Sequence, residues 1–504
     1  MGQEIRRQIG LLINRKGEVA YVTVGDHRGI MIPDLSAYSS SPARFKGLRL
    51  IHSHLKREGL SDEDLTDLAL LRLDLVCAIE TGEDGLPGLA HTAHLIPENP
   101  EGRYWQIMPS VSPAGLRGDF ISFILALEGE FARRQKTRKI ETTDRAILVR
   151  VDTGEGRAGD RAISAEISLD ELKELARSAG VEIFDTVIQR RPERDPKFLM
   201  GKGRLSSLVI RAMQIGANLL IFDHELTPAQ VRSITDFTEL KVIDRTQLIL
   251  DIFAQRAHSR EGKIQVELAQ LKYLLPRLTL MDKALSRLTG GIGARGPGET
   301  KLEINRRRVR ERIALLEKDI KGVEKSRGQR RMRRKKAGIP IISIVGYTNA
   351  GKSTLLNALT ASAVFTENRL FATLDPKSSR LRFPRDTEAI ITDTVGFIRD
   401  LPPDLFAAFR ATMDELQEAD FLLHVVDVGN PCFEDQIRAV IKILQDLEIA
   451  DKPTLLVFNK ADRLADKSLQ AEFCRRFNAI AISALEPATL PPLILKLGSL
   501  VQPR

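Results

Sequence analysis

The chain has 504 residues, of which 43% are hydrophobic and 28% are charged, and its formal net charge is +9. Such a length predicts three or more domains, and the excess of positive charge indicates a polyanionic partner such as a nucleic acid. No apolar run is long enough for membrane insertion, and the first residues lack the apolar core of a signal peptide.

The cysteines are widely separated in the sequence, so they predict neither a disulfide framework nor a zinc ligand set: Cys77, Cys432 and Cys474. This pattern is typical of a reducing compartment, and we expect a cytoplasmic protein. We also expect the protein to be a monomer in solution.

The first half of the chain is predicted to form two α/β parts. The first part, residues 1–140, has candidate strands and a candidate helix at 18–24, 48–54 and 61–75. The second part, residues 141–258, alternates short strands with helices, which favours a small parallel sheet. Its strands are expected at 146–151, 181–184, 218–222 and 241–243, and its helices at 169–179 and 203–215.

Two histidines and one carboxylate form a candidate metal site in the first part. His52 and His54 end a predicted strand, and Asp64 lies in the first turn of the next helix. These side chains could hold Zn²⁺ with one position open for water. The segment resembles the zinc motif of JAMM-type metalloproteases, with one residue fewer after His54 and with Glu18 as the candidate catalytic glutamate. A working zinc site remains one interpretation, and surface histidines or a relic of that fold remain the other.

Residues 259–337 are predicted to form a basic helical hairpin. Apolar residues recur at helical spacing over 263–279, where Pro276 would kink or end the helix, and again over 299–324. A glycine-rich loop joins the two helices, and such a tip can follow an RNA backbone closely. The residues that we expect to contact RNA are Gly290, Gly291, Gly293, Arg295 and Gly296 in this loop and Arg330 and Arg331 beyond the second helix. A solvated charged helix with a polybasic linker is the alternative.

A phosphate-binding loop follows the apolar run 341–345 and precedes a candidate helix, which is the context that a P-loop requires. Backbone amides in such a loop point at phosphate oxygens, and the helix adds its positive end. Lys352 would reach the β- and γ-phosphates as a catalytic group, and the Ser353 hydroxyl would bind Mg²⁺. The predicted nucleotide-binding residues are Gly346, Asn349, Ala350, Gly351, Lys352, Ser353 and Thr354.

Later positions are predicted to sense the γ-phosphate. Asp393 ends an apolar strand and can hold Mg²⁺, while the amide of Gly396 can meet the γ-phosphate. Thr373 is the candidate switch residue that would close on Mg²⁺, so Thr373 and Gly396 join Lys352 as predicted catalytic residues. Phe397 stands where Ras-like proteins carry the glutamine that orients the attacking water, and we therefore expect slow intrinsic hydrolysis.

The bound base is predicted to be guanine. Asp462 can accept hydrogen bonds from the ring N–H and the exocyclic amine of guanine, a donor pair that adenine lacks. Lys460 would lie over the base, and Asn459 would tie this loop to the P-loop. The last base-contacting loop contains Ser483 and Ala484.

The predicted cofactors are therefore GTP and Mg²⁺, with K⁺ as a further candidate. Asn349 occupies the P-loop position whose amide helps to bind K⁺ in potassium-stimulated GTPases, where the ion can replace an arginine finger. A role for Asn349 in capping the loop alone is equally open.

Several segments of the chain resemble the HflX family over roughly residues 141–497: Gly201–Arg204, Phe222–Gln230, Val242–Thr246, Leu250–Phe253, Gly290–Glu299, Phe371–Asp375 and Phe409–Met413. The resemblance implies a ribosome-associated GTPase that binds the large ribosomal subunit and can split stalled or stressed ribosomes. It also implies that Gly290–Glu299 probes ribosomal RNA near the peptidyl-transferase centre. Two alternatives are an RNA-binding assembly factor that uses nucleotide only as an affinity switch, and a GTPase fused to a zinc hydrolase-like domain.

These patterns together predict a multidomain α/β protein. Its GTPase domain is expected to be a doubly wound sheet with the nucleotide at the carboxyl ends of the strands. The four predicted parts are an N-terminal α/β extension, a small parallel α/β domain, a basic helical hairpin with a glycine-rich tip and a P-loop GTPase domain, over 1–140, 141–258, 259–337 and 338–504.

Overall fold

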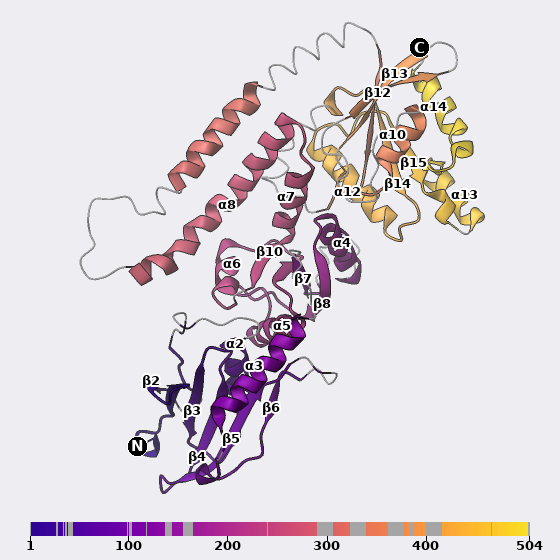
Figure 1. Ribbon diagram of the computed structural model, residues 1–504. Coiled ribbons are helices and arrows are strands. Elements are labelled where there is room, and N and C mark those ends of the chain that lie inside the picture. Colours follow the sequence, from indigo (N-terminus) through magenta and orange to yellow (C-terminus); the bar gives the residue numbers. More distant parts are fainter. Residues whose placement is uncertain are drawn as a thin grey trace. The chain divides into compact units, whose positions relative to one another are not determined.

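The structure of the chain is a computed structural model (Figure 1). It describes residues 2–501 except 27–28, 34, 36–37, 39–43, 98, 100–102, 117, 137–143, 155–164, 239, 290–305, 323–338, 361–376, 384–386, 395, 400–415 and 465. The predicted site residues that lie outside this description are Gly290, Gly291, Gly293, Arg295, Gly296, Arg330, Arg331 and Thr373. None of the helices in the described ranges combines the length and hydrophobicity that a membrane-spanning segment needs.

Contacts divide the chain into two compact units. The first unit comprises Met1–Ala165, Val181–Phe222 and Ser233–Val242, and the second comprises Glu166–Gly180, Asp223–Arg232 and Ile243–Arg504. The division passes through the region predicted as one small α/β domain. The boundaries of the four predicted parts stay a proposal.

The first unit begins with a mixed sheet in the order β2-β1-β3-β4-β5-β6. Its strands are β1 (Ile9–Asn14), β2 (Val19–Val24), β3 (Leu48–His54), β4 (Leu75–Thr81), β5 (Pro87–Leu95) and β6 (Trp105–Ile107). Strands β3 and β4 are parallel, and the other neighbouring strands are antiparallel. The helices of this part are α1 (Gly2–Ile5), α2 (Asp62–Leu70) and α3 (Phe120–Lys136), with a short turn η1 (Pro113–Gly115).

Alternation along β3 decides which side chains of this sheet are buried. Every second residue from Leu48 to His54 is buried, because successive side chains of a strand point to opposite faces. Leu48 and Leu50 pack with Leu12 of β1 and with Leu65 and Leu68 of α2 in one hydrophobic core. The predicted helix over 61–75 is shorter than expected, since α2 ends at Leu70.

A second sheet contains β7 (Arg145–Asp152), β8 (Glu182–Arg190), β9 (Leu219–Phe222) and β10 (Lys241–Asp244), in the order β10-β9-β7-β8. Strand β7 is parallel to both β8 and β9, which confirms the predicted parallel arrangement for these strands. Helix α5 (Lys202–Ile215) ends at Gly216, whose φ of 71° suits a residue without a side chain.

Helices dominate the part of the second unit that precedes the GTPase sheet. They are α4 (Ala165–Ser178), α6 (Pro228–Thr235), α7 (Arg245–Arg256), α8 (Arg260–Thr289) and a helix over 306–322. The first residue of α4 and the last residues of α6 belong to the first unit. Helix α8 continues through Pro276, so of the two predicted effects of this proline, a kink or an end of the helix, the end is wrong. Two ion pairs join α8 to the helix over 306–322: Arg312–Glu267 and Lys272–Glu317, each at 2.7 Å.

The GTPase sheet has the order β12-β13-β11-β14-β15-β16, and only β12 runs antiparallel to its neighbour. Its strands are β11 (Ile341–Gly346), β12 (Lys377–Phe383), β13 (Thr387–Asp393), β14 (Phe421–Asp427), β15 (Thr454–Asn459) and β16 (Ile480–Ala481). Its helices are α10 (Lys352–Thr360), α12 (Phe433–Asp446), α13 (Lys467–Phe477) and α14 (Pro491–Val501), with short turns η2 (Ala461–Arg463) and η3 (Pro487–Thr489).

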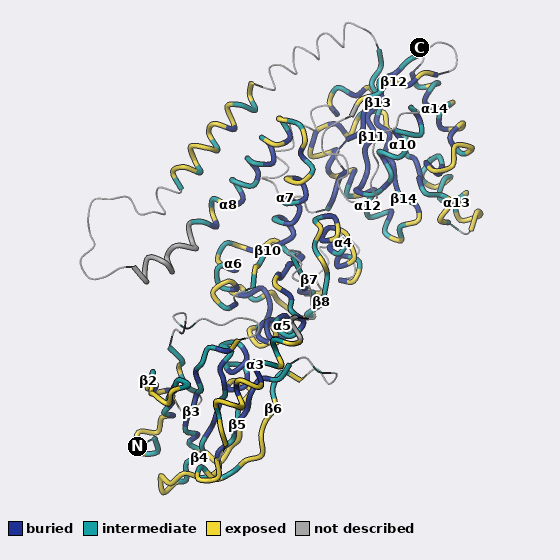
Figure 2. Tube along the Cα trace, in the orientation of Figure 1, coloured by how far each residue is buried: buried dark blue, intermediate teal, exposed yellow. Residues whose placement is uncertain are grey.

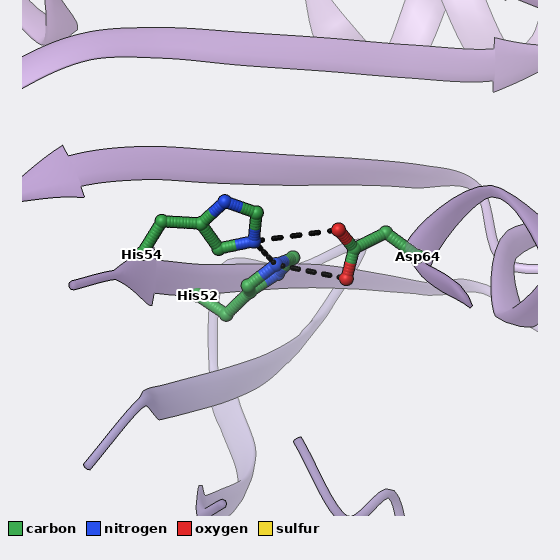
Figure 3. Close-up of side chains that lie close together, drawn as sticks. All are labelled: His52, His54 and Asp64. Carbon is green, nitrogen blue, oxygen red and sulfur yellow. Dashed lines mark hydrogen bonds and ion pairs between the residues drawn. The ribbon is translucent and has the colours of Figure 1, made fainter. Parts of the chain in front are cut away.

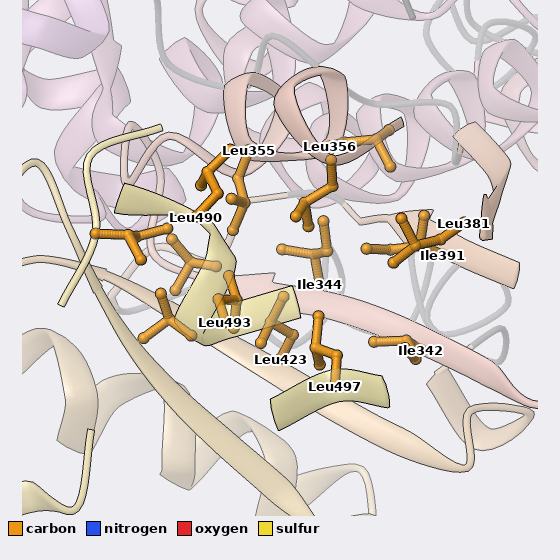
Figure 4. Packing of buried hydrophobic residues seen from close by; sticks show 14 of the residues in the cluster. Ile342, Ile344, Leu355, Leu356, Leu381, Ile391, Leu423, Leu490, Leu493 and Leu497 are labelled. Carbon is orange, nitrogen blue, oxygen red and sulfur yellow. The ribbon is translucent and has the colours of Figure 1, made fainter. Parts of the chain in front are cut away.

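Helices cover both faces of this sheet. On one face, leucines of α10 and α14 pack against Ile344 and Leu423 of the central strands (Figure 4). On the other face, Phe433 of α12 packs against Phe458 of β15 and against the aromatic rings of α13. The central strands are therefore buried almost throughout (Figure 2), and the predicted doubly wound P-loop GTPase fold is confirmed.

Candidate functional site

The P-loop leaves the carboxyl end of β11 and is shaped by two glycines. Gly346 has φ 152°, and a Cβ there would lie 2.2 Å from the carbonyl oxygen of Val425. Gly351 has φ 87°, and its Cβ would lie 2.3 Å from Nδ2 of Asn459. A larger residue would strain the backbone and collide at either position, so the tight loop depends on both glycines. Asn349 supplies the remaining left-handed turn, with φ 62°.

The predicted phosphate and magnesium residues converge where α10 begins. Nζ of Lys352 is buried and donates to the carbonyl oxygens of Gly346 and Tyr347, at 3.1 and 2.8 Å. Oγ of Ser353 donates to Oδ2 of Asp393 at 2.6 Å. A hydroxyl and a carboxylate at this separation can both reach one hard cation, so the geometry fits Mg²⁺. Predicted Thr354 lies in the first turn of α10 and is half-buried.

The segment after β13 lies against the P-loop. A Cβ at Gly396 would come within 3.0 Å of Nζ of Lys352, so the backbone here passes as close to the lysine as a glycine permits. Phe397 donates its N–H to the Gly346 carbonyl, and its own carbonyl accepts from the amide of Thr348. The Phe397 side chain is 1% exposed, which places it in the core and away from solvent.

The base-recognition loops are tied to the P-loop by Asn459. Its Nδ2 donates to the carbonyl of Ala350 at 2.9 Å, and its Oδ1 accepts from the amide of Ala484 at 2.9 Å. This bridge brings together the loops after β11, β15 and β16, as the sequence predicted. Ser483 is buried beside it, and Asp462 lies exposed on η2 with its carboxylate available to a base.

The contacts of Lys460 show that Asp427 is a site residue that the sequence did not suggest. Its Nζ donates to the carbonyl of Asn349 at 2.7 Å and forms an ion pair with Asp427 at 2.7 Å. Asp427 ends β14 directly beside Asn459, which ends β15. In the sequence, Asp427 is only a carboxylate at the end of a buried strand. It points to the nucleotide site only once the order of the strands in the sheet is known.

A second group that the sequence did not suggest lies within the second unit. The Tyr347 hydroxyl of the P-loop donates to Glu171 of α4, and Arg399 forms an ion pair with Glu171 at 2.5 Å. Arg245 of α7 pairs with Glu171 at 3.0 Å and with Asp223 at 3.1 Å. Burial would raise the pKa of Glu171, but Arg245 and Arg399 outweigh it and lower that pKa to about 2.

The histidines of the first unit lie together, as the metal-site interpretation requires (Figure 3). His52 and His54 project from β3 toward Asp64 of α2, and all three residues are buried. Nε2 of His52 is 2.9 Å from Nε2 of His54 and 3.1 Å from Oδ1 of Asp64, while Nε2 of His54 is 3.3 Å from Oδ2. The interpretation as plain surface histidines is therefore wrong.

Glu18 does not belong to this cluster. It accepts a hydrogen bond from Asn14 and is exposed at the turn between β1 and β2. Asn14 pairs with Leu48, at the opposite end of β3 from the histidines. The expectation that Glu18 is a catalytic glutamate for this site is therefore wrong.

The pKa of Lys352 predicts how GTP binding depends on pH. Burial lowers this pKa to about 8, against a smaller raising effect of Asp393. Phosphate oxygens next to Nζ favour its charged form, so the pKa is higher in the complex than in the free protein. Affinity is then full below the free pKa and falls as the pH rises through it, by up to about tenfold per pH unit.

Titration with a fluorescent GTP analogue from about pH 7 to about pH 9 measures this slope. Lys352→Arg is the matched control, because a guanidinium keeps its charge over the whole range and should remove the slope. A constant affinity of the wild-type protein across that range would contradict the assignment.

Comparisons with known proteins cover most of the chain after residue 165. Three family models match: GTP-binding GTPase N-terminal over 166–254, GTP-binding GTPase Middle Region over 256–334 and 50S ribosome-binding GTPase over 341–460. Among solved structures, a GTP-binding protein from Sulfolobus solfataricus in complex with GDP has 25% identity and a TM-score of 0.40, and the match covers 71% of this chain and 99% of that one.

Curated relatives give the clearest assignment. GTPase HflX of Caldanaerobacter subterraneus subsp. tengcongensis is 51% identical over 299 residues, which cover 59% of this chain and 70% of the relative. GTPase HflX of Escherichia coli strain K12 is 44% identical over 347 residues, which cover 67% of this chain and 82% of the relative. The chain therefore belongs to the HflX family of GTPases and is a GTP-hydrolysing enzyme.

Proposed function

We propose that this GTPase binds the large ribosomal subunit and couples GTP binding and hydrolysis to ribosome splitting or rescue under stress. The observation that carries the proposal is the match of residues 341–460 to the family model described as a 50S ribosome-binding GTPase. The net charge of +9 supports a polyanionic partner. We expect the protein to act as a monomer in the cytoplasm, where ribosomes work.

The helices α8 and 306–322 supply the surface that we propose for ribosomal RNA. Their two ion pairs hold the helices against each other, while Arg308 and Arg310 are exposed on the second helix. Arginine side chains presented in this way suit phosphate contacts. We propose that the contacts extend to Gly290, Gly291, Gly293, Arg295 and Gly296 in the loop and to Arg330 and Arg331.

We propose the following roles at the nucleotide. Ser353, Asp393 and Thr373 bind Mg²⁺, and Asp462 pairs with guanine. Lys352 and the Gly396 amide contact the γ-phosphate, which their close approach supports. The carbonyl of Asn349 already accepts from Lys460, and we propose that its side-chain amide helps to bind K⁺.

Phe397 explains why hydrolysis would depend on the ribosome. An aromatic side chain in the core can neither donate to water nor accept from it, so another group must orient the attacking water. We propose that ribosome binding supplies or positions that group. The same observation supports the alternative of an assembly factor that uses nucleotide only as an affinity switch, and the two differ in whether the ribosome stimulates turnover.

GTP turnover in potassium buffer, with and without purified large ribosomal subunits, tests the proposal. We expect the subunits to raise turnover by about 100-fold or more, since pre-organised electrostatic groups contribute on that order. Replacing potassium by sodium should lower the stimulated rate if K⁺ takes part.

Arg330→Ala combined with Arg331→Ala should weaken stimulation while GTP affinity stays unchanged. Intact GTP binding without any stimulation would favour the assembly-factor alternative.

Zinc binding by the first unit is a second candidate function. It is favoured by the convergence of His52, His54 and Asp64, whose ligand atoms all lie within 4.8 Å of one another. We propose that these side chains hold Zn²⁺. A hydrolase role would further require a carboxylate base beside the metal, and Glu18 does not meet that requirement.

A further inference from the structure

The spacing of the three ligand atoms matches what one zinc ion requires. Zinc–nitrogen and zinc–oxygen bonds of about 2.0–2.1 Å place neighbouring ligand atoms about 3.3 Å apart in a tetrahedral shell. Nε2 of His52 is 2.9 Å from Nε2 of His54 and 3.1 Å from Oδ1 of Asp64, and Nε2 of His54 is 3.3 Å from the other carboxylate oxygen, Oδ2. One ligand atom from each residue lies within 4.8 Å of the other two, so a small rotation of the carboxylate would let one ion contact all three residues.

Neighbouring groups already orient two of these ligands. Ser61 caps α2 and donates from both its amide and its hydroxyl to Oδ2 of Asp64, at 2.8 and 2.7 Å. Nδ1 of His54 lies 3.4 Å from the carbonyl of Glu58. If Nδ1 carries the proton and donates it there, Nε2 keeps its lone pair for a metal. Such outer contacts fix the tautomer and the direction of metal ligands.

Gln8 provides an independent observation at the same place. It precedes β1, where Leu12 pairs with Leu50 and Gly10 pairs with His52. Continuing this register by two residues places Gln8 opposite His54, on the buried face that both histidines share. Gln8 is 2% exposed, and its Oε1 has no hydrogen-bond partner among the described residues.

A buried acceptor without a donor lowers the stability of the folded protein, so a donor bound next to Gln8 would remove this cost. A water held by the metal is such a donor, because coordination polarises its O–H bonds. A glutamine can accept this hydrogen bond but cannot take the proton, as a carboxylate base would. Among the described residues, no other His, Cys, Asp or Glu joins the three ligands.

We propose that the first unit holds one Zn²⁺ on His52, His54 and Asp64, with the fourth position occupied by an exchangeable oxygen ligand that donates to Gln8. The centre then binds metal and ligand without hydrolysing a substrate. This inference rests on the zinc binding proposed above and adds the fourth position and its partner. The adjacent apolar side chains of Leu12 and Leu50 favour a tetrahedral ion over an octahedral one, which would need two further ligands.

Metal analysis of the purified full-length chain tests the three ligands. We expect about one zinc per chain, and a loss of most of it in the His52→Ala, His54→Ala double variant and in Asp64→Ala, even with zinc in excess. His91→Ala is the matched control, because His91 lies on β5, pairs with Glu80 and Ser110 and should leave the zinc content unchanged. Hydrogen-exchange protection of β1 and β4 in each variant shows whether the first unit is still folded. Unchanged zinc in the ligand variants, or iron in place of zinc, would overturn the metal assignment.

Zinc affinity of Gln8 variants tests the fourth position separately. Gln8→Leu should keep the full zinc content at saturation but weaken zinc affinity about 10–100-fold, as loss of an outer-sphere hydrogen bond does. Gln8→Glu restores an acceptor and should recover the affinity. An unchanged affinity in Gln8→Leu, with zinc still lost in the ligand variants, would refute the role of Gln8 and leave zinc binding intact. Zinc-dependent cleavage of a peptide substrate by the wild-type chain would refute the non-hydrolytic assignment.

Discussion

Asp462→Asn should change the base preference of the enzyme from guanine to xanthine nucleotides. The aspartate can accept from two guanine donors, whereas an asparagine amide presents a donor to one of them and an acceptor to the other. A polar group left unpaired in the complex then penalises GTP, by roughly 100-fold or more in affinity. Xanthine carries a carbonyl in place of the exocyclic amine, so it pairs with the asparagine. Competition of GTP and XTP for the site measures the change.

A control variant in the same region separates base recognition from loop stability. Asp466 is the N-cap of α13, and Asp466→Asn makes the same change of charge while keeping a good capping residue. We expect this variant to retain the wild-type preference for GTP. An Asp462→Asn protein that still prefers GTP would disprove the assignment of Asp462 to the base.

Asp244→Ala should destabilise the helices α7 and α8 by about 3–5 kcal/mol, because it removes one partner of a buried ion pair. Asp244 accepts from the amide of Gln247, as the N-cap of α7, and from the amide of Leu226. It also accepts from the Tyr273 hydroxyl at 2.6 Å and pairs with Arg277 at 3.3 Å. Without the carboxylate, the buried guanidinium of Arg277 loses this counter-charge.

Hydrogen exchange of the full chain measures this loss locally, which suits a protein whose parts need not unfold together. We expect faster exchange in α7 and α8, with exchange in β11 and β14 unchanged. Lys241→Ala is the control, since its ion pair with Asp144 is largely exposed and should contribute less than about 1 kcal/mol. Wild-type protection of α7 and α8 in Asp244→Ala would show that this carboxylate does not hold the two helices.

The nucleotide site could be predicted from sequence because each of its motifs sits at a strand end with its own local signal. Lys352, Ser353 and Asp393 lie together as expected, and Asn459 links the loops as expected. Asp427 and Glu171 could not be predicted, because their partners are remote in the sequence and no local pattern marks a long-range ion pair. Thr373 and the glycine-rich loop stay predictions, since they lie outside the described residues.

The first unit was harder to predict for physical reasons. In β1 and β4, apolar residues follow one another over 11–13 and 75–79, so the sequence shows no regular alternation of apolar and polar residues there. The His52–His54 pair was visible because a strand places both side chains on one face. Gln8 became informative only through the strand register, which sequence spacing alone cannot supply. Pro276 shows the opposite case, where helix packing tolerates a residue that local propensity disfavours.

The burial of Phe397 limits how substitutions at this position could change the rate of GTP hydrolysis by this enzyme. Its ring fills the core, while its backbone is bonded on both sides to the P-loop. A glutamine introduced there would put an amide in an apolar space instead of beside the γ-phosphate, at a cost in stability. One substitution therefore cannot turn this enzyme into a self-timed switch like Ras. Under the function proposed above, the rate of hydrolysis is set by contact with the ribosome, and substitutions that speed the reaction are expected at that contact.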